Sequence, residues 1–210
     1  MEDGGEAANR RAHWNNVYSR TAPTGVSWYR PHLETSLCLI ESAADHDAAI
    51  LDVGSGQSTL LDDLIHRGYH NVTACEISES AIQEAKSRLG ENAALVQWQA
   101  GDILELALPQ KYYDVWHDRA LFHFLIKPAD RQRYVSRMTA ALKSAGHVIM
   151  ATFGPEGPAR CSGLEVCRYS AGLLAGTLGS HFRLAESLIE DYETPFGTTQ
   201  QFLYCHFVAA

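Results

Sequence analysis

Two glycines and one glutamate have a type and spacing that suggest ligand chemistry. The segment Ile50–Leu60, ILDVGSGQSTL, is an apolar run that ends in Gly54-Ser55-Gly56 before a helical pattern begins. Glycine suits a tight turn and a close approach of a ligand to the main chain. Glu76 ends the next apolar run, 20 residues after Gly56. A carboxylate there can accept hydrogen bonds from both hydroxyls of a ribose, so the spacing favours a ligand that contains a nucleoside.

The glycine turn lacks one part of the dinucleotide-binding fingerprint. That fingerprint is G-x-G-x-x-G, which sets a pyrophosphate on the N-terminus of the following helix. Thr59 stands at the third glycine position here. The sequence therefore predicts a tight turn and a ribose carboxylate without a dedicated phosphate site. A turn with a purely structural role is the alternative interpretation of the two glycines alone.

Short apolar runs alternate with helical patterns on both sides of this turn. The runs predicted as strands are 49–53, 71–77, 94–99, 112–118 and 147–153, and the predicted helices are 58–67, 78–89 and 130–143. Strands that alternate with helices form βαβ units and a parallel sheet, and right-handed crossovers place helices on both faces. The pattern predicts an α/β fold in which Gly54 and Glu76 meet at one end of the sheet.

The last third of the chain departs from this alternation. Two β-rich runs, 182–192 and 201–208, are joined by a short segment with no helix. A connection that short permits only an antiparallel pair. We therefore expect the sheet to end with a reversed strand at one edge.

Four segments taken in order resemble the class I S-adenosylmethionine-dependent methyltransferases. They are LDVGSG, CEIS with Glu76, AGDI with Asp102, and YYDVWHDRALFHFL, and the similarity runs from about Ala12 to Phe207. The resemblance implies a three-layer αβα, Rossmann-like fold, with a mostly parallel seven-stranded sheet and an antiparallel last strand. It also implies methyl transfer, with S-adenosylmethionine as the cofactor.

The resemblance assigns roles to residues at the ends of the first two strands. Gly54, Ser55 and Gly56 would line the methionine part of the cofactor through backbone groups. Glu76 would hold the ribose hydroxyls, and Ile77 would lie against the adenine.

Three further cofactor residues are implied after the third and fourth strands. Asp102 would accept a hydrogen bond from the adenine amino group, and the N–H of Ile103 would donate to the ring. Asp118 would meet the methionine ammonium or the substrate. From the residues alone, Asp102 in GDI fits a helix or turn cap equally well.

Aromatic residues near the N-terminus resemble a segment of the elongation-factor lysine methyltransferase-like branch of that family. They are Trp14, Tyr18, Trp28 and Tyr29, in HWNNVY and VSWY. The resemblance implies that they close over the cofactor, and aromatic faces suit a sulfonium cation. Trp14 and Tyr18 are also one helical turn apart, so packing of an amphipathic helix on the sheet is the alternative.

The segment HDRALFHF after the fourth strand holds the candidate catalytic residues, Asp118 and His123. Methyl transfer needs a general base only where the acceptor must lose a proton. His123 is predicted to face the pocket as that base; a histidine packed beside Phe122 and Phe124 is the alternative. Arg119 is placed either to bind an acidic substrate or to pair with Asp118.

The same segment bears on the methyl acceptor. Protein lysine methyltransferases of the seven-strand type often carry an acid-plus-aromatic motif at this point, and DRALFHF departs from it. The departure favours a small-molecule acceptor, a thiol, hydroxyl or amine, over a protein. Protein lysine methylation, a nucleotide-dependent oxidoreductase and a non-catalytic cofactor-binding protein are the alternatives. The Gly- and Pro-rich loop 153–163 lies where a substrate lid would form, and a purely structural loop is the alternative.

Composition excludes several classes of protein. The 210 residues include 17 basic and 25 acidic side chains, a net charge of −8, which disfavours a nucleic-acid partner. No apolar run approaches the ~18–20 residues of a membrane helix, and the polar start is no signal peptide. The five cysteines lack the spacing of a metal site; they are Cys38, Cys75, Cys161, Cys167 and Cys205. Unpaired cysteines favour the cytoplasm.

The length fits a single domain over 1–210. Within it, 1–11 is expected to be flexible and 12–45 to form a helical cofactor lid. The sequence carries no signal for an oligomeric state.

Overall fold

The computed structural model describes residues 3–210, which form one seven-stranded sheet and a separate two-stranded hairpin. The strands are β1 (Ile50–Val53), β2 (Val72–Glu76), β3 (Val96–Ala100), β4 (Tyr113–Arg119), β5 (Leu142–Phe153), β6 (Arg160–Cys161), β7 (Leu164–Glu165), β8 (Phe182–Glu193) and β9 (Thr199–Ala209). The α-helices are α1 (Asp3–Arg20), α2 (Glu34–Ala43), α3 (Leu60–His66), α4 (Glu79–Leu89), α5 (Pro128–Ala141) and α6 (Ala171–Leu178). Short 3₁₀ turns are Pro23–Gly25, Gly90–Leu95 and Phe122–Phe124.

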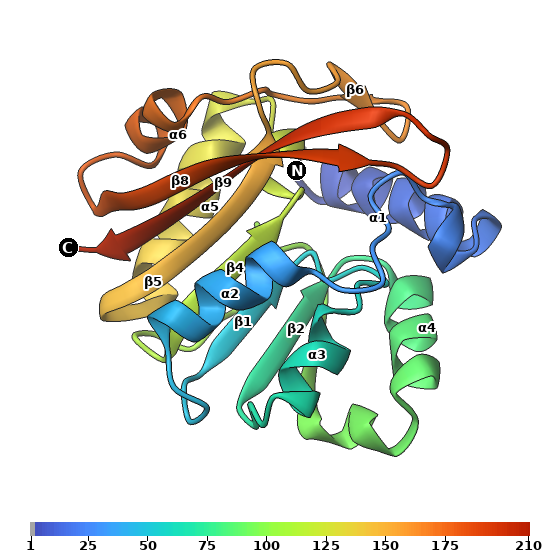
Figure 1. Ribbon diagram of the computed structural model, residues 1–210, viewed down its shortest axis with the longest axis horizontal. Helices are drawn as coiled ribbons and strands as arrows, with labels where there is room; N and C mark the ends of the chain where they lie inside the picture. The colour runs from blue at the N-terminus through green and yellow to red at the C-terminus, as the bar shows by residue number, and fades with distance from the viewer. Residues whose placement is uncertain (1–2) are drawn as a thin grey trace.

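The strand order is β3-β2-β1-β4-β5-β9-β8, and β1 to β5 pair in parallel (Figure 1). The antiparallel last strand is confirmed, because β9 runs opposite to both β5 and β8. It does not lie at the edge of the sheet, however. The β8–β9 turn places β8 on the far side of β9, so β8 takes the edge and β9 is enclosed.

Alternation along the strands sends side chains into two cores, one on each face of the sheet. On β4, Trp116 packs in the core under α5 and α6. Its neighbour Val115 packs in the core under α2 and α3. Successive strand residues point to opposite faces, which gives the three layers expected from the sequence.

Capping residues explain where several helices begin and end. The Oγ atom of Ser78 accepts a hydrogen bond from the Ala81 N–H at 3.3 Å, and α4 ends at Gly90. The helix α6 begins in the same way at Ser170, and it was not expected from the sequence. None of the helices in residues 3–210 is long and apolar enough to cross a membrane.

The N-terminal helix α1 lies across the carboxyl end of the sheet, beside α4 (Figure 1). Residues 3–11, expected to be flexible, belong to this helix; residues 1 and 2 lie outside the described part of the chain. Side chains of α1 find fixed partners there, since Arg10 Nε donates to Asp102 at 2.7 Å and Ser78 Oγ donates to Asn15 at 2.8 Å. These contacts account for the order of the segment.

Candidate functional site

A cavity opens at the carboxyl ends of β1 to β4, beneath α1. Its lining comes from α1, from the segments that follow β1 to β4, and from β9. Every predicted cofactor residue except Asp118 lines it: Trp14, Tyr18, Trp28, Tyr29, Gly54, Ser55, Gly56, Glu76, Ile77, Asp102 and Ile103.

The glycine turn after β1 requires its glycines. Gly54 has φ +68° and Gly56 has φ +53°, a region that side-chain-bearing residues rarely adopt. A Cβ atom on Gly56 would lie 2.5 Å from Oη of Tyr18, and one on Gly54 would lie 2.7 Å from Cδ1 of Leu121. The turn therefore brings bare main chain to the cavity wall between two side chains.

Glu76 faces the cavity from the end of β2 and is 4% exposed. One carboxylate oxygen accepts the N–H of Gly56 at 2.9 Å, and the other accepts the N–H of Ser78 at 2.8 Å. Burial raises the pKa of this carboxyl to about 7, although these backbone hydrogen bonds act against the rise. Each oxygen keeps lone pairs for a further donor, so the group can accept two ligand hydroxyls.

Asp102 has a structural role as well as a place on the cavity wall. Its Oδ1 atom accepts the N–H of Leu104 at 2.9 Å, which is the turn cap that the sequence offered as an alternative. Its Oδ2 atom accepts from Arg10 Nε at 2.7 Å. The adenine role expected of Asp102 stays a prediction.

Asp52 is a cavity residue that sequence reasoning missed. Its Oδ1 atom lies 2.7 Å from Nδ1 of His117, and Nε2 of His117 lies 2.9 Å from Oγ of Ser36. The Oδ2 atom of Asp52 is buried and has no hydrogen-bond partner in the described chain. Its position in LDVGSG, two residues before the turn, is the signal that could have found it.

Asp118 does not line the cavity, contrary to the expectation that it meets the cofactor or the substrate. It is fully buried, and its carboxylate accepts the N–H groups of Leu121 and Phe122 and the hydroxyl of Tyr134. Strand alternation turns Asp118 toward α5, while His117 and Arg119 point to the opposite face. Burial raises the pKa of Asp118 to about 6. The residue holds the turn after β4.

His123 is also absent from the cavity wall, so its placement does not support the role of a base. It is fully buried, with its ring 4.5 Å from that of Phe124 and 4.6 Å from that of Phe153. Its Nδ1 atom accepts the Phe153 N–H at 3.2 Å. Burial lowers the pKa of His123 to about 3. The packing alternative describes it better.

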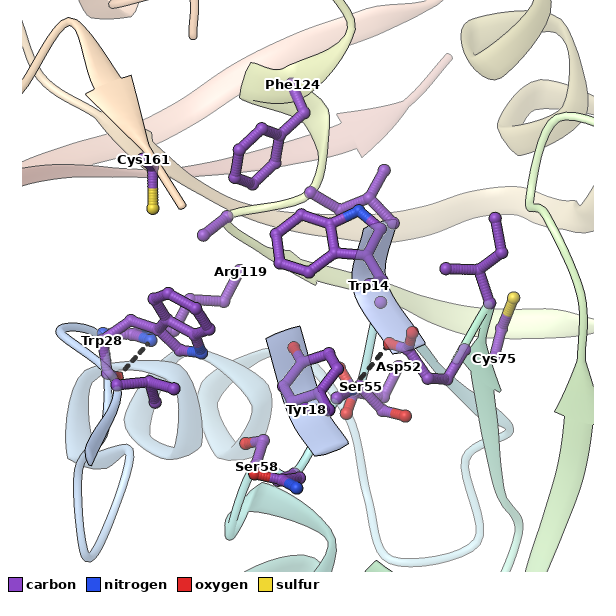
Figure 2. A pocket seen from close by; sticks show the side chains of 18 of the residues that line it. Trp14, Tyr18, Trp28, Asp52, Ser55, Ser58, Cys75, Arg119, Phe124 and Cys161 are labelled. Atoms are coloured by element: carbon purple, nitrogen blue, oxygen red, sulfur yellow. Dashed lines mark hydrogen bonds between the residues drawn. The ribbon is translucent and has the colours of Figure 1, made fainter. Parts of the chain in front are cut away.

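Aromatic side chains from the N-terminal segment gather over the cavity, with Trp14 in the middle (Figure 2). The ring of Trp14 lies 5.9 Å from that of Tyr18, 6.3 Å from that of Trp28 and 5.0 Å from that of Phe124. The contact with Phe124 joins α1 to the segment after β4. The group forms a roof whose faces are available to a ligand.

Arg119 and Cys161 lie on the side of the cavity away from Cys75 (Figure 2). Arg119 does not pair with Asp118. Its Nε atom donates to the hydroxyl of Tyr204 at 3.0 Å, and its Nη1 atom donates to the carbonyl of Trp28 at 3.1 Å. Burial raises the pKa of the Cys161 thiol to about 11, so it stays protonated at neutral pH.

Comparisons with known proteins agree with this geometry. Residues 50–146 match a family model described as a methyltransferase domain. Human EEF1A lysine methyltransferase 2 is 28% identical over 168 residues, which are 71% of this chain and 70% of that protein. The segment 50–146 therefore carries a methyltransferase domain. Several solved structures with this fold are S-adenosylmethionine-dependent methyltransferases, and one of them holds S-adenosylhomocysteine.

Solved structures share the fold of this methyltransferase domain at low identity. A methyltransferase from Anabaena variabilis has a TM-score of 0.73 and 14% identity, covering 95% of this chain and 93% of that one. The 1,6-didemethyltoxoflavin-N1-methyltransferase of Burkholderia thailandensis has a TM-score of 0.69 and 20% identity, covering 92% and 81%.

Two further cavity residues of the methyltransferase domain were not found from the sequence. Arg10 was assigned to a flexible segment, although Arg10, Trp14 and Tyr18 recur every four residues on one helix face. Phe202 on β9 lines the cavity as well, and only the strand order brings it near β4. Arg10 could have been found from its spacing in the sequence, whereas Phe202 required the sheet topology.

Proposed function

We propose that this methyltransferase acts on a small-molecule acceptor held in the half of the cavity beyond the glycine turn. The observation that carries the proposal is the composition of that half. Its walls include Trp28, Phe124, Phe153 and Phe202, and Arg119 adds a cation; Arg30, which also lines the cavity, is paired with Glu190. The carboxylates that line the cavity, Asp52, Glu76 and Asp102, belong to β1, β2 and the segment after β3. A lysine ammonium would meet a cation there and no carboxylate to hold it.

We propose S-adenosylmethionine as the methyl donor, and the cofactor half offers partners for its adenosine and its ammonium. We assign the ribose hydroxyls to Glu76 and the adenine amino group to Asp102, with the N–H of Ile103 donating to the ring and Ile77 against its face. Gly54, Ser55 and Gly56 lie beside the methionine chain. The chemistry of these donors and acceptors fits the cofactor without a phosphate site.

The ammonium of the cofactor, assigned from the sequence to Asp118, goes instead to Asp52 in this proposal. The buried Oδ2 atom of Asp52 lacks a partner in residues 3–210 and lines the cavity. A buried carboxylate oxygen without a donor is costly, and a cationic ligand would supply one. Ser55 Oγ is a second buried atom without a partner at the same wall.

The lid in this proposal consists of Trp14, Tyr18, Trp28 and Tyr29. Their segment is fixed at both ends, by the Arg10–Asp102 pair and by the hydroxyl of Tyr192, which donates to the carbonyl of Tyr29. Aromatic faces are attracted to a sulfonium, and the covered site excludes water from the reaction.

The cofactor supplies a methyl group on a sulfonium that is already activated, so the chain contributes position and desolvation. Neither His117 nor His123 offers a free base at the cavity. Both ring nitrogens of His117 have partners, and His123 lies outside the cavity. An acceptor atom that is already a nucleophile at neutral pH, such as a thiolate, a carboxylate oxygen or a neutral amine, suits this environment.

A labelled-methyl assay tests the proposal. Purified protein is incubated with tritiated S-adenosylmethionine and with either the dialysable or the non-dialysable fraction of a cell extract. We expect label to enter small molecules of the dialysable fraction. The Glu76→Gln variant should incorporate less label. Label that enters only the protein fraction would refute the small-molecule acceptor.

Protein lysine methylation is the second candidate, and the similarity to EEF1A lysine methyltransferase 2 favours it. In that case the label would appear on lysine side chains of a protein in the non-dialysable fraction, and the assay above separates the two outcomes.

We further propose a single domain in a reducing compartment such as the cytoplasm, because all five cysteines are free.

A further inference from the structure

The side chain of Arg119 turns from the end of β4 toward β9. Its Nε atom donates to Tyr204 Oη at 3.0 Å, and its guanidinium carbon lies 4.6 Å from the centre of the Phe202 ring. The Trp28 carbonyl accepts from Nη1 at 3.1 Å. Two neutral acceptors and a ring therefore fix the guanidinium at the cavity wall.

The charge of Arg119 has no counterpart among the residues that the structure describes. Within residues 3–210, no carboxylate lies within ion-pair distance of it, and its Nη2 atom is buried without a hydrogen-bond partner. The neighbouring thiol of Cys161 is neutral. Arg30, which lines the same cavity, differs because it pairs with Glu190 at 2.8 Å. A partly buried cation without an anion is unfavourable, and a ligand can supply the missing charge.

The cofactor carries a carboxylate of its own, but its proposed anchors lie on other strands than the partners of Arg119. Glu76 and Gly56, which are assigned to the cofactor above, lie at the ends of β2 and β1, whereas Arg119 leans across β5 to residues of β9. The walls beside Arg119 are apolar and largely aromatic, and they include Phe124, Leu164 and Phe202. A molecule bound there meets one cation in an apolar surround.

We propose that the methyl acceptor is an apolar organic acid whose carboxylate pairs with Arg119. The inference rests on the proposed function, since it requires a second small molecule beside the cofactor. A guanidinium binds a carboxylate through charge-assisted hydrogen bonds. The N–H groups of Arg119 Nη2 have no acceptor among residues 3–210 and can donate to such a carboxylate. The rings of Trp28 and Phe124 would hold the apolar part of the acid.

Calorimetry on protein saturated with S-adenosylhomocysteine tests the inference. The probes are benzoate, phenylacetate, indole-3-acetate and octanoate, each compared with its own primary amide. We expect at least one acid to bind roughly tenfold or more tightly than its amide, and added salt to reduce that preference. If no acid binds better than its amide, the inference is wrong.

Substitutions at Arg119 sharpen the test. Arg119→Gln should abolish the preference for the acid and leave the affinity for S-adenosylhomocysteine unchanged, while Arg119→Lys should keep part of the preference. Arg168→Gln, which removes the same charge from an exposed position near Gly157, should keep all of it. A folded Arg119→Gln protein that loses affinity for S-adenosylhomocysteine would mean that Arg119 holds the cofactor, and would overturn the inference.

The outcomes also separate this inference from the proposed function. If no acid binds more tightly than its amide but small molecules are still methylated, only the proposal that the acceptor is an organic acid is rejected. Label that enters only protein rejects the small-molecule acceptor itself. Should Arg119→Gln fail to fold, the amide comparison and the salt dependence of the parent protein still decide the question.

Discussion

The carboxylate of Glu76 joins two separate turns, because one oxygen accepts the Gly56 N–H at 2.9 Å and the other accepts the Ser78 N–H at 2.8 Å. The glycine turn after β1 and the start of α4 are thereby held at a fixed separation. The same carboxylate faces the cavity. Its charge therefore serves the architecture of the site and the binding of a ligand.

Replacing Glu76 with glutamine tests its part in binding. Glu76→Gln keeps the shape but removes the charge and one acceptor, so the affinity for S-adenosylhomocysteine should fall by about 1.5–3 kcal/mol. Glu79→Gln is the matched control, because Glu79 is exposed three residues further on. Calorimetry on both variants gives the comparison; equal affinities would exclude a direct contact.

The raised pKa of Glu76 predicts a pH dependence of cofactor binding. With a pKa of about 7, the carboxyl is increasingly protonated below neutral pH and loses its acceptor strength. Affinity for S-adenosylhomocysteine should therefore increase as the pH rises through about 7, and Glu76→Gln should lack this component. An identical pH profile in both proteins would contradict the assignment.

The same shift predicts the sign of a stability change in the protein without ligand. The native pKa lies above the ordinary value of 4.5, so the native state binds more protons than the unfolded state between those two values. The Glu76 contribution to stability is therefore fully present at low pH and declines as the pH rises toward about 7. Denaturant unfolding of the parent relative to Glu76→Gln measures this decline.

The contribution of His123 to stability should depend on pH in the opposite direction to that of Glu76. Burial lowers its native pKa to about 3 from 6.5, so the unfolded chain takes up the proton first. Its contribution to stability is present above about pH 6.5 and is lost as the pH falls toward 3. His123→Gln should flatten the acid limb of the unfolding curve while leaving the pH profile of methyl transfer unchanged. A changed transfer profile would restore His123 as a base.

Gly56→Ala should abolish cofactor binding. The new Cβ atom would lie 2.5 Å from Tyr18 Oη, on a backbone with φ +53°. Gly68→Ala is the control, since Gly68 has φ +88° but no atom within 4 Å of the added Cβ. Both variants should lose about 1–2 kcal/mol of stability from backbone strain. Binding measured by calorimetry should be lost only in Gly56→Ala.

Trp14→Ala tests the lid. Loss of the ring that contacts Tyr18, Trp28 and Phe124 should raise the dissociation rate of S-adenosylhomocysteine by about tenfold. Asn16→Ala changes an exposed residue of the same helix and should leave the rate unaltered. Stopped-flow fluorescence measures both; an unchanged rate in Trp14→Ala would mean that the segment only packs on the sheet.

Much of this architecture could be predicted because it depends on local patterns. Gly54, Gly56 and Glu76 are recognisable from their spacing, and the alternation of strands and helices gives the sheet. Asp118 and His123 were misplaced because the direction of a side chain after a strand depends on which face packs against α5, and the sequence does not state that. Arg119 and Phe202 meet only because β9 lies next to β5. The short β6–β7 hairpin and α6 carried too weak a pattern to be expected.

The enclosed position of β9 has a consequence for how the molecule is made. Until β9 is synthesised and inserted, β5 and β8 each keep a row of unsatisfied amide and carbonyl groups, which neighbouring chains can pair with. Chains interrupted in the β8–β9 turn would thus expose the β5 edge and an unpaired β8, whereas in the finished sheet β9 covers one side of each and the outer edges are those of β3 and β8. Nascent copies would depend on chaperones, or on rapid completion, to escape aggregation.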